Sequence, residues 1–206
     1  LHDTGNDLLT VNAGNHLDED EGAIENSGLI ESTSAELRAA AGNIYALAIN
    51  NEGTVRATNV DKSGGRIRLV ADQGTTLSSG TLDASSDSAE GGSVHALGDR
   101  VAITGDIDAS GATAGGEILV GGDFQGANPE ILNAQTTAVT GNLSADATET
   151  GDAGKVITWS DGNTLFTGSA TATAVNGDGG LIEISGKEGL SFSGVANAAS
   201  QNGTGG

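Results

Sequence analysis

The chain of 206 residues contains no cysteine and no methionine, only one proline, and aromatic residues at just 2% of its positions. Without cysteine, neither a disulfide framework, a thiolate metal site nor a cysteine nucleophile can form. The scarcity of large rings excludes an ordinary globular core built around aromatic side chains. Something other than bulky side chains must therefore organise the interior.

Basic residues are also scarce, with 8 Lys and Arg against 28 Asp and Glu, for a formal net charge of −20. Such a charge repels phosphate backbones, so nucleic acid is not an expected partner. No apolar run approaches the roughly 18 residues of a membrane span, so none is expected. With 36% hydrophobic and 17% charged residues, the composition favours a folded chain over a disordered one.

Glycine is abundant, at 34 residues, and it recurs in two series with a period of about 25 residues. Pairs of small residues precede alternating apolar runs at Ala41-Gly42, Gly64-Gly65, Gly91-Gly92, Gly115-Gly116, Ala153-Gly154 and Gly179-Gly180, and a final pair, Gly205-Gly206, continues the series. Single glycines lie inside the same units at Gly28, Gly53, Gly80, Gly105, Gly141, Gly168 and Gly194. Two independent markers therefore share one repeat.

The residues after these glycines form columns of one kind. The second residue after each pair is Ile44, Ile67, Val94, Ile118, Val156 or Ile182. The second residue after each single glycine is Ile30, Val55, Leu82, Ile107, Leu143, Ala170 or Ala196. Polar residues alternate with them, which predicts strands with one buried face. Before the single glycine, pairs such as Val101 and Ile103 indicate a third strand in each unit.

Three short strands per period predict an all-β parallel β-solenoid of about eight coils, forming a single domain over 1–206. We expect glycine at the corners because turns out of the sheet need positive φ. The less regular segment 1–21 is expected to be a cap or a preceding coil. The widest spacing predicts an inserted loop at 122–136, which holds the only proline, Pro129.

Several stretches resemble the shaft repeats of filamentous haemagglutinin-type exoproteins of two-partner secretion systems. They are ALAINNEGTVRATN at 46–59, GGRIRLVAD at 64–72, GDIDASG at 105–111, GGEILVGGDFQG at 115–126, KVITWSDGNTLFTG at 155–168 and GGLIEISGKEGLSFSG at 179–194. The resemblance extends from about Gly22 to Gly206. It implies a right-handed β-helix, export through an outer-membrane transporter, and a secreted or surface-displayed bacterial protein that serves as an adhesin, a haem-capture protein or a contact-dependent toxin.

No signal peptide, amino-terminal secretion motif or toxin-like globular end is recognisable, so we expect a segment of the shaft. The expected function is therefore structural and non-enzymatic: an extracellular, adhesin-like or fibre-forming shaft that stacks end to end with itself or with neighbouring shaft segments. The alternative is a solenoid that binds surface glycans or cleaves polysaccharides. No catalytic motif supports that alternative directly.

Asp83 and Asp108 occupy one outward column, so their carboxylates are expected about one coil spacing apart. With Asp106 nearby, a calcium ion could relieve their repulsion. The alternative is that Arg56, one coil below Asp83, pairs with it. The sequence thus offers Asp83, Asp106 and Asp108 as candidate metal ligands.

Trp159 is the only tryptophan, and strand parity places it outward together with Ile157. An outward aromatic indicates a ligand or an interface, and Phe124 in the predicted insertion is the second candidate. His95 also falls at an outward position, where we expect a solvated side chain. Asn26 and Asn51 recur 25 residues apart and predict a short asparagine ladder.

Overall fold

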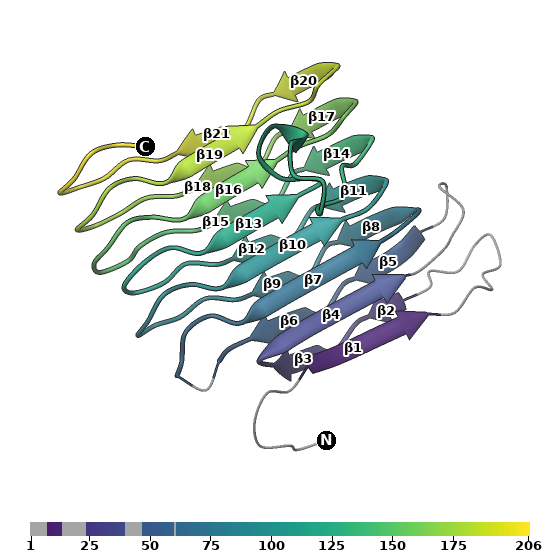
Figure 1. Ribbon diagram of the computed structural model, residues 1–206, viewed down its shortest axis with the longest axis horizontal. Helices are drawn as coiled ribbons and strands as arrows, with labels where there is room; N and C mark the ends of the chain where they lie inside the picture. The colour runs from purple at the N-terminus through teal and green to yellow at the C-terminus, as the bar shows by residue number, and fades with distance from the viewer. Residues whose placement is uncertain (1–7, 14–23, 40–46, 60) are drawn as a thin grey trace.

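The computed structural model describes residues 8–13, 24–39, 47–59 and 61–206. Apart from one 3₁₀ turn, the regular elements in these residues are short strands, and they wind into one stack of coils (Figure 1). Three sheets run along the stack, and each coil contributes one strand to each sheet. The predicted all-β parallel β-solenoid with three strands per coil is confirmed.

Each sheet has seven described strands, and neighbouring strands in a sheet are parallel. Sheet A contains β1 (Leu8–Ala13), β4 (Ser34–Ala39), β7 (Arg66–Ala71), β10 (Ser93–Leu97), β13 (Glu117–Val120), β16 (Lys155–Thr158) and β19 (Leu181–Ile184). Sheet B contains β2 (Ile24–Asn26), β5 (Leu47–Asn51), β8 (Thr75–Ser78), β11 (Arg100–Ile103), β14 (Thr136–Val139), β17 (Asn163–Phe166) and β20 (Gly189–Phe192). Sheet C contains β3 (Leu29–Ser32), β6 (Thr54–Ala57), β9 (Thr81–Asp83), β12 (Asp106–Asp108), β15 (Asn142–Ser144), β18 (Ser169–Thr171) and β21 (Val195–Asn197).

The number of coils is slightly smaller than predicted. Seven strands in each sheet correspond to about six full turns from the first strand to the last, rather than eight coils. The difference arises because two coils exceed the period. Ser34 pairs with Arg66, 32 residues later, and Glu117 pairs with Lys155, 38 residues later.

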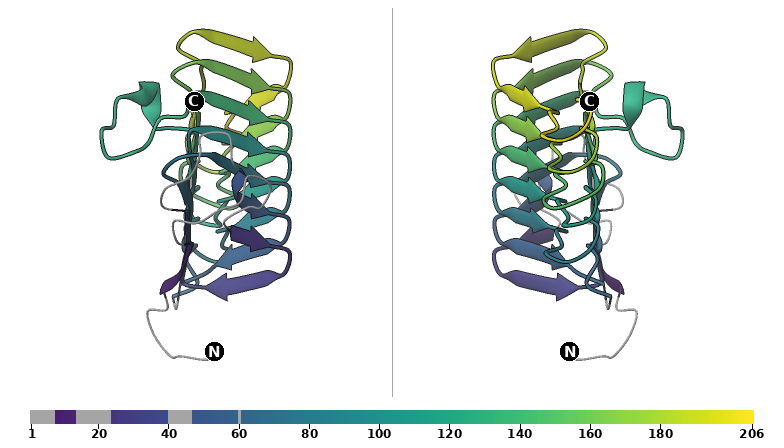
Figure 2. Two further views of the ribbon diagram at one scale, coloured as in Figure 1. Left: turned by 90° about the vertical axis from the view of Figure 1, so that its right-hand side faces the viewer. Right: turned by 90° about the vertical axis from the view of Figure 1, so that its left-hand side faces the viewer.

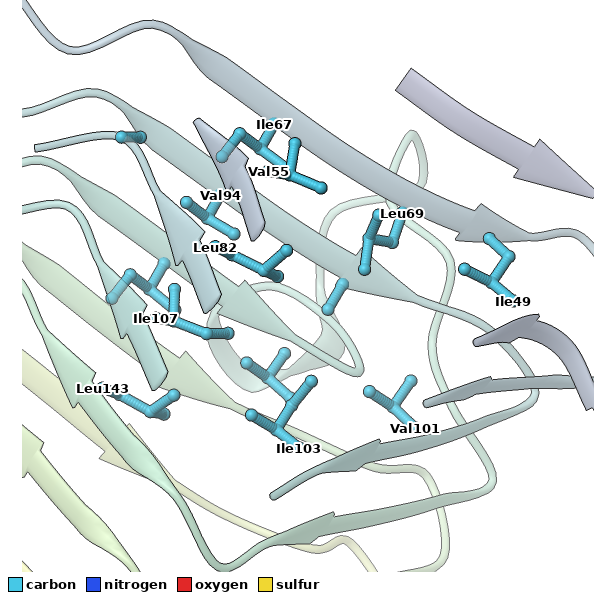
Figure 3. Close-up of a cluster of buried hydrophobic side chains, with 14 of the residues drawn as sticks. Ile49, Val55, Ile67, Leu69, Leu82, Val94, Val101, Ile103, Ile107 and Leu143 are labelled. Atoms are coloured by element: carbon cyan, nitrogen blue, oxygen red, sulfur yellow. The ribbon is translucent and has the colours of Figure 1, made fainter. Parts of the chain in front are cut away.

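The predicted inward columns are confirmed by the strand register. In sheet C, Leu82 pairs with Val55 below it and Ile107 above it, and these side chains are buried (Figure 3). In sheet A, Val94 lies between Ile67 and Ile118 in the same way. Because like stacks on like, aliphatic columns fill the interior with few aromatic rings.

The first member of the sheet A column differs from the prediction. Ala35 of β4, not Ile44, pairs with Ile67 and is buried. Ile44 itself and the pair Ala41-Gly42 lie outside the described residues. Because Ser34 pairs with Arg66, Thr33 occupies the place that Gly65 takes in the next coil, so the repeat is less regular here than its glycine markers suggested. The predicted cap at 1–21 also lies outside the described residues, except for β1.

The corner glycines have a different cause from the predicted one. Gly80 and Gly105 do not have positive φ. Instead, a Cβ added to Gly105 would collide with the carbonyl oxygen of Gly80, and one added to Gly80 would collide with that of Gly53. Backbones of successive coils approach too closely at this corner for any side chain, which is why glycine recurs with the coil period.

Buried polar side chains join successive coils at the edges of sheet B. The asparagine ladder is confirmed, since Asn26 Nδ2 donates to Asn51 Oδ1 at 2.7 Å and Asn51 Nδ2 donates to Ser78 Oγ at 3.0 Å. At the opposite corner, the Thr137 hydroxyl donates to the Trp159 carbonyl oxygen at 2.7 Å. These bonds satisfy polar groups that would otherwise be costly to bury. Within the described part of the chain, no helix is long and apolar enough to cross a bilayer.

Candidate functional site

A segment of the chain leaves the stack between β13 and β14. These residues, 121–135, are called the sheet-A loop, because they stand off the shaft beside the outer face of sheet A (Figure 2). The loop lies where the insertion 122–136 was predicted. It begins with Gly121 at φ +76° and contains a single 3₁₀ turn, Phe124–Gly126. The Asp123 carboxylate caps this turn by accepting from the Phe124 N–H at 2.7 Å.

The sheet-A loop covers a second hydrophobic cluster, separate from the solenoid interior. Leu119, Ile157 and Trp159 point outward from sheet A and pack together, with Ile131 of the loop against them. Their exposed fractions are only 2%, 0% and 9%. Parity predicted that Ile157 and Trp159 face outward, but the loop shields both from solvent. The cluster therefore attaches the loop to the shaft.

The loop backbone lies directly against the indole ring. A Cβ added to Gly122 would come within 2.7 Å of Trp159 Cδ1, and one added to Gly126 within 2.6 Å of Cε2. Trp159 Nε1 donates to Asp161 Oδ1 at 3.2 Å, and Asn133 Nδ2 donates to the Gly126 carbonyl oxygen at 3.0 Å. Glycine is needed at these positions because the backbone must approach the ring closely.

The two aromatic candidates thus differ in surroundings. Trp159 forms an interface with the chain's own loop, whereas Phe124 on the 3₁₀ turn is 43% exposed. Of the two aromatic rings, only that of Phe124 is exposed enough to contact another molecule. Ligand binding by either residue stays a prediction.

Ion pairs hold the loop from a second side. Lys155 Nζ lies 2.7 Å from Glu117 Oε2 and 3.3 Å from Asp123 Oδ1, so one ammonium joins the sheet to the loop. Burial alone would lower the pKa of Lys155, but hydrogen bonds and attraction to the two carboxylates outweigh it and raise that pKa. A third contact, from the Gln125 N–H to Glu183 Oε2 at 2.9 Å, ties the loop to β19.

Glu117 is the most strongly perturbed carboxyl group described. His95 Nε2 lies 2.8 Å from its Oε1 while Lys155 lies against its Oε2. The hydrogen bond to His95 lowers the pKa most, burial opposes it, and the bond and charge of Lys155 lower it further, to about 2. Glu117 is therefore held as a carboxylate that binds two partners.

The structure corrects the expectation that His95 is solvated. The residue faces outward as predicted, in register with Arg68 and Leu119, but its side chain is only 14% exposed. Its Nδ1 has no hydrogen-bond partner and is buried. The outer face of sheet A is covered here by its own ion-pair network, which a period-two pattern does not reveal.

The aspartate column of sheet C has the predicted register. Asp83 pairs with Arg56 below it and with Asp108 above it. Arg56 Nε donates to Asp83 Oδ2 at 2.8 Å, and its Nη1 lies 3.3 Å from Glu31 Oε1. Partial burial raises the pKa of Asp83, but the hydrogen bonds from Ser85 and the Arg56 pair outweigh it, so the net shift is downward.

The candidate metal ligands each have protein partners. Asp83 is bound by Arg56, Asp106 Oδ1 accepts from Asn142 Nδ2 at 2.8 Å, and Asp108 Oδ1 accepts from the Ser110 N–H at 2.8 Å. Among the residues that the structure describes, no three His, Asp or Glu side chains converge as a metal site would require. Calcium binding by Asp83, Asp106 and Asp108 stays a prediction.

The hydrophobic cluster and the ion pairs hold the sheet-A loop against the outer face of sheet A. The sequence signal for it was the run of apolar residues at outward positions, Leu119, Ile157 and Trp159, opposite an insertion that carries Ile131. Parity indicated outward positions for Ile157 and Trp159, but nothing in the pattern linked them to Leu119 or to Ile131 of the insertion. The anchoring role of Lys155 and Glu117 left no signal beyond two opposite charges in register.

The chain is similar to the crystal structure of the HMW1 secretion domain from Haemophilus influenzae, with a TM-score of 0.71 and 26% sequence identity. The match covers 85% of this chain and 48% of that one, so this chain spans about half of its length. No protein-family model and no curated protein matches the chain. Similarity to filamentous haemagglutinin in particular thus rests on the quoted repeats, whereas similarity to a secretion domain rests on fold and sequence together.

Proposed function

We propose that the chain is a β-helical shaft segment of a bacterial exoprotein that crosses the outer membrane through a dedicated transporter and is displayed or released outside. The observation that carries the proposal is the similarity to the HMW1 secretion domain over 85% of the chain. The shaft-type repeats quoted above support it. The similar structure is itself a secretion domain, whereas the repeats in this sequence indicate a shaft segment and carry no recognisable secretion motif.

The solenoid supplies reach and stiffness. Every coil is hydrogen-bonded to its neighbours in three sheets, and buried columns exclude water from the centre. The net charge of −20 keeps neighbouring shafts apart unless divalent cations bridge them. In an adhesin-like protein, such a shaft holds binding elements away from the cell without taking part in chemistry.

The last described coil offers a face for end-to-end contact. Leu181, Leu190, Phe192 and Val195 are each more than 40% exposed there. Beside them lies a hollow of about 450 Å³ that includes Ile182 and Ile184. Edge strands and apolar columns of this kind favour a further coil, so a neighbouring shaft segment or a second copy stacks on this face.

Sedimentation velocity over a range of concentrations tests the stacking. We expect concentration-dependent association that Phe192→Asp abolishes and that Phe124→Asp, on the sheet-A loop, leaves intact. A monomer at all concentrations, or equal association by the Phe192→Asp variant, contradicts end-to-end stacking.

Export is tested in a Gram-negative host that produces the full parent protein with or without its outer-membrane transporter. Antibodies against residues 61–206 are expected to label intact cells or the medium only when the transporter is present. Retention inside the cell in both strains contradicts the proposal. Release into the medium without the transporter contradicts the proposed export route.

The absence of enzymatic activity is part of the proposal. Incubation with acidic and neutral polysaccharides is expected to give no cleavage. Cleavage that disappears in Asp83→Ala or Asp108→Ala variants would replace the shaft proposal with the polysaccharide-cleaving alternative.

A further inference from the structure

Part of the outer face of sheet B is free of acidic residues, although the molecule as a whole is acidic. The strands β8, β11, β14 and β17 of sheet B contain no Asp or Glu and a single basic residue, Arg100, in a chain that carries 28 acidic residues. Carboxylates resume at the corners, with Asp99 before β11 and Asp106 after it. We call the outward residues of these four strands, with the corner residue that follows each strand, the neutral face.

The strands β8, β11, β14 and β17 lie side by side in the stack (Figure 1), and their register forms three columns that run along the shaft. A polar column contains Thr75, Arg100, Thr136 and Asn163. A middle, aliphatic column contains Leu77, Ala102, Ala138 and Leu165. A corner column, exposed to solvent, contains only hydroxyl side chains, at Ser79, Thr104, Thr140 and Thr167.

Ala102, Ala138 and Leu165 of the middle column line a groove of about 610 Å³ together with the polar column, and the groove continues onto β20. Ala102 and Ala138 form its floor because their side chains are small. The larger Leu165, which is 42% exposed, stands next to Ala138 in the same column. Polar side chains flank the floor on both sides. An apolar floor with polar groups beside it is the arrangement typical of small-molecule sites.

The size of the face argues against a protein partner. The four strands, each about 16 Å long with its corner residue and spaced about 4.8 Å apart, give an area of roughly 300 Å². A stable protein interface needs about 800 Å² from each partner. A second copy would also bring the acidic corners of both molecules together, including Asp99 and Asp106, which like-charge repulsion disfavours.

The acidic surroundings of the neutral face favour an uncharged small ligand over an acidic one. Carboxylates at the corners and a net charge of −20 repel acidic polymers such as uronic-acid chains. An uncharged sugar chain meets no such penalty. Its C–H faces can lie on Ala102, Ala138 and Leu165 while its hydroxyl groups exchange hydrogen bonds with the threonine and asparagine side chains of the flanking columns.

We propose that the neutral face binds an uncharged oligosaccharide of a few sugar units, which lies along the shaft axis across β8, β11, β14 and β17. The site differs from the Phe124 and Trp159 region, which lies on sheet A. It goes beyond the proposed shaft function, since a shaft could be exported and stiff without any such site.

The test uses a glycan array of neutral tetra- to hexasaccharides, with oligogalacturonate as the acidic probe and the 206-residue chain as the analyte. Each neutral glycan that gives signal is then titrated by calorimetry. We expect binding to at least one neutral oligosaccharide, no binding to oligogalacturonate, and little change in affinity with salt, because no ion pair is formed.

Two variants place a carboxylate on the face. Ala138→Glu fills the floor and Thr140→Glu alters the exposed corner column, so the second keeps the test informative if the first disturbs folding. Each is expected to weaken binding about tenfold or more, because a carboxylate there must be desolvated. Ser169→Glu on sheet C adds the same charge elsewhere and is expected to leave the affinity unchanged. Circular dichroism checks that all three remain folded.

Absence of binding to every neutral glycan overturns the proposal, as does neutral-glycan binding that survives Thr140→Glu in full. Preference for oligogalacturonate overturns it too. Dimerisation of the wild-type chain that Thr140→Glu abolishes would assign the face to a second copy instead. None of these results bears on transporter-dependent export, so failure here is distinguishable from failure of the proposed function.

Discussion

At the scale of single residues, Trp159 and Phe124 show how exposure separates a structural ring from an available one. The indole is 9% exposed beneath the sheet-A loop, whereas the Phe124 ring is 43% exposed on the turn above it. Both belong to the same local structure, which makes them a matched pair for mutation.

Trp159→Ala is expected to lower the free energy of unfolding by about 3 kcal/mol, because it removes a buried ring and leaves the loop without support. Phe124→Ala is expected to cost less than about 1 kcal/mol. Urea unfolding measures both values, and limited proteolysis should cut within 121–135 only in the Trp159→Ala protein. Equal costs for the two variants would show that the loop does not pack on Trp159 in solution.

The pKa of Glu117, about 2 instead of 4.5, makes stability depend on pH. Because folding favours the carboxylate, its contribution is fully present above pH 4.5 and is lost as the pH falls toward 2. The side chain is 36% exposed, so solvent screening reduces the contribution to about 1 kcal/mol.

Glu117→Gln is accordingly expected to destabilise the protein at pH 7 and to flatten the decline in stability between pH 4.5 and 2. Urea unfolding at several pH values measures the difference between wild type and variant. Parallel pH profiles for the two proteins would exclude the ion pairs of Glu117 as a source of acid sensitivity.

The residue scale also shows where sequence reasoning fails. Alternation was enough to place Trp159 and His95 outward, since it follows from strand geometry alone. It could not show that either is covered, because the cover comes from a loop and from ion pairs whose positions depend on tertiary packing. The Arg56 and Asp83 pair was predicted as an alternative, because both residues fall in one column.

At the scale of elements, the corner glycines determine how closely coils can stack. A Cβ on Gly105 would collide with the Gly80 carbonyl oxygen, whereas a Cβ on Gly28, at the lowest described corner of the same series, would meet no atom within 4 Å. The two glycines belong to the same series, but among the described residues only Gly105 has a coil directly beneath it.

Gly105→Ala is therefore expected to lower the free energy of unfolding by about 1 to 3 kcal/mol, through steric overlap at a packed corner. Gly28→Ala is expected to be neutral or to stabilise by up to about 1 kcal/mol, because it reduces the entropy of the unfolded chain. Chemical unfolding of both variants provides the comparison. A neutral Gly105→Ala would mean that successive coils are further apart at this corner than described.

Element register was predictable wherever two markers agreed. Val55, Leu82, Ile107 and Leu143 follow single glycines, and they stack as predicted. The prediction for Ile44 was wrong because it relied on one small-residue pair in an atypically long coil, where Ala35 takes the inward position instead. Repeats identify which residues are equivalent only while the coil length stays near its period.

At the scale of the whole molecule, the three sheets produce faces with different roles. Sheet A carries the loop and an ion-pair network, sheet C carries the aspartate column, and sheet B presents the neutral face. Net charge was evident from composition, but its uneven distribution became visible only when the strands were assigned to sheets. The shaft proposal depends on these faces belonging to one continuous stack.

The most direct test of that continuity is a spin-label distance along one column. Thr54 and Val195 are linked by the pairs Thr54 to Thr81, Asp106, Asn142, Ser169 and Val195. Because the chain has no cysteine, Thr54→Cys and Val195→Cys allow selective labelling for pulsed electron paramagnetic resonance. Five coil steps of about 4.8 Å place the two backbone positions about 24 Å apart. The measured distances between the spin labels should form one narrow distribution near that value, shifted only by the length of the label side chains. A broad distribution, or a centre far from that value, would contradict an in-register solenoid and the shaft built on it.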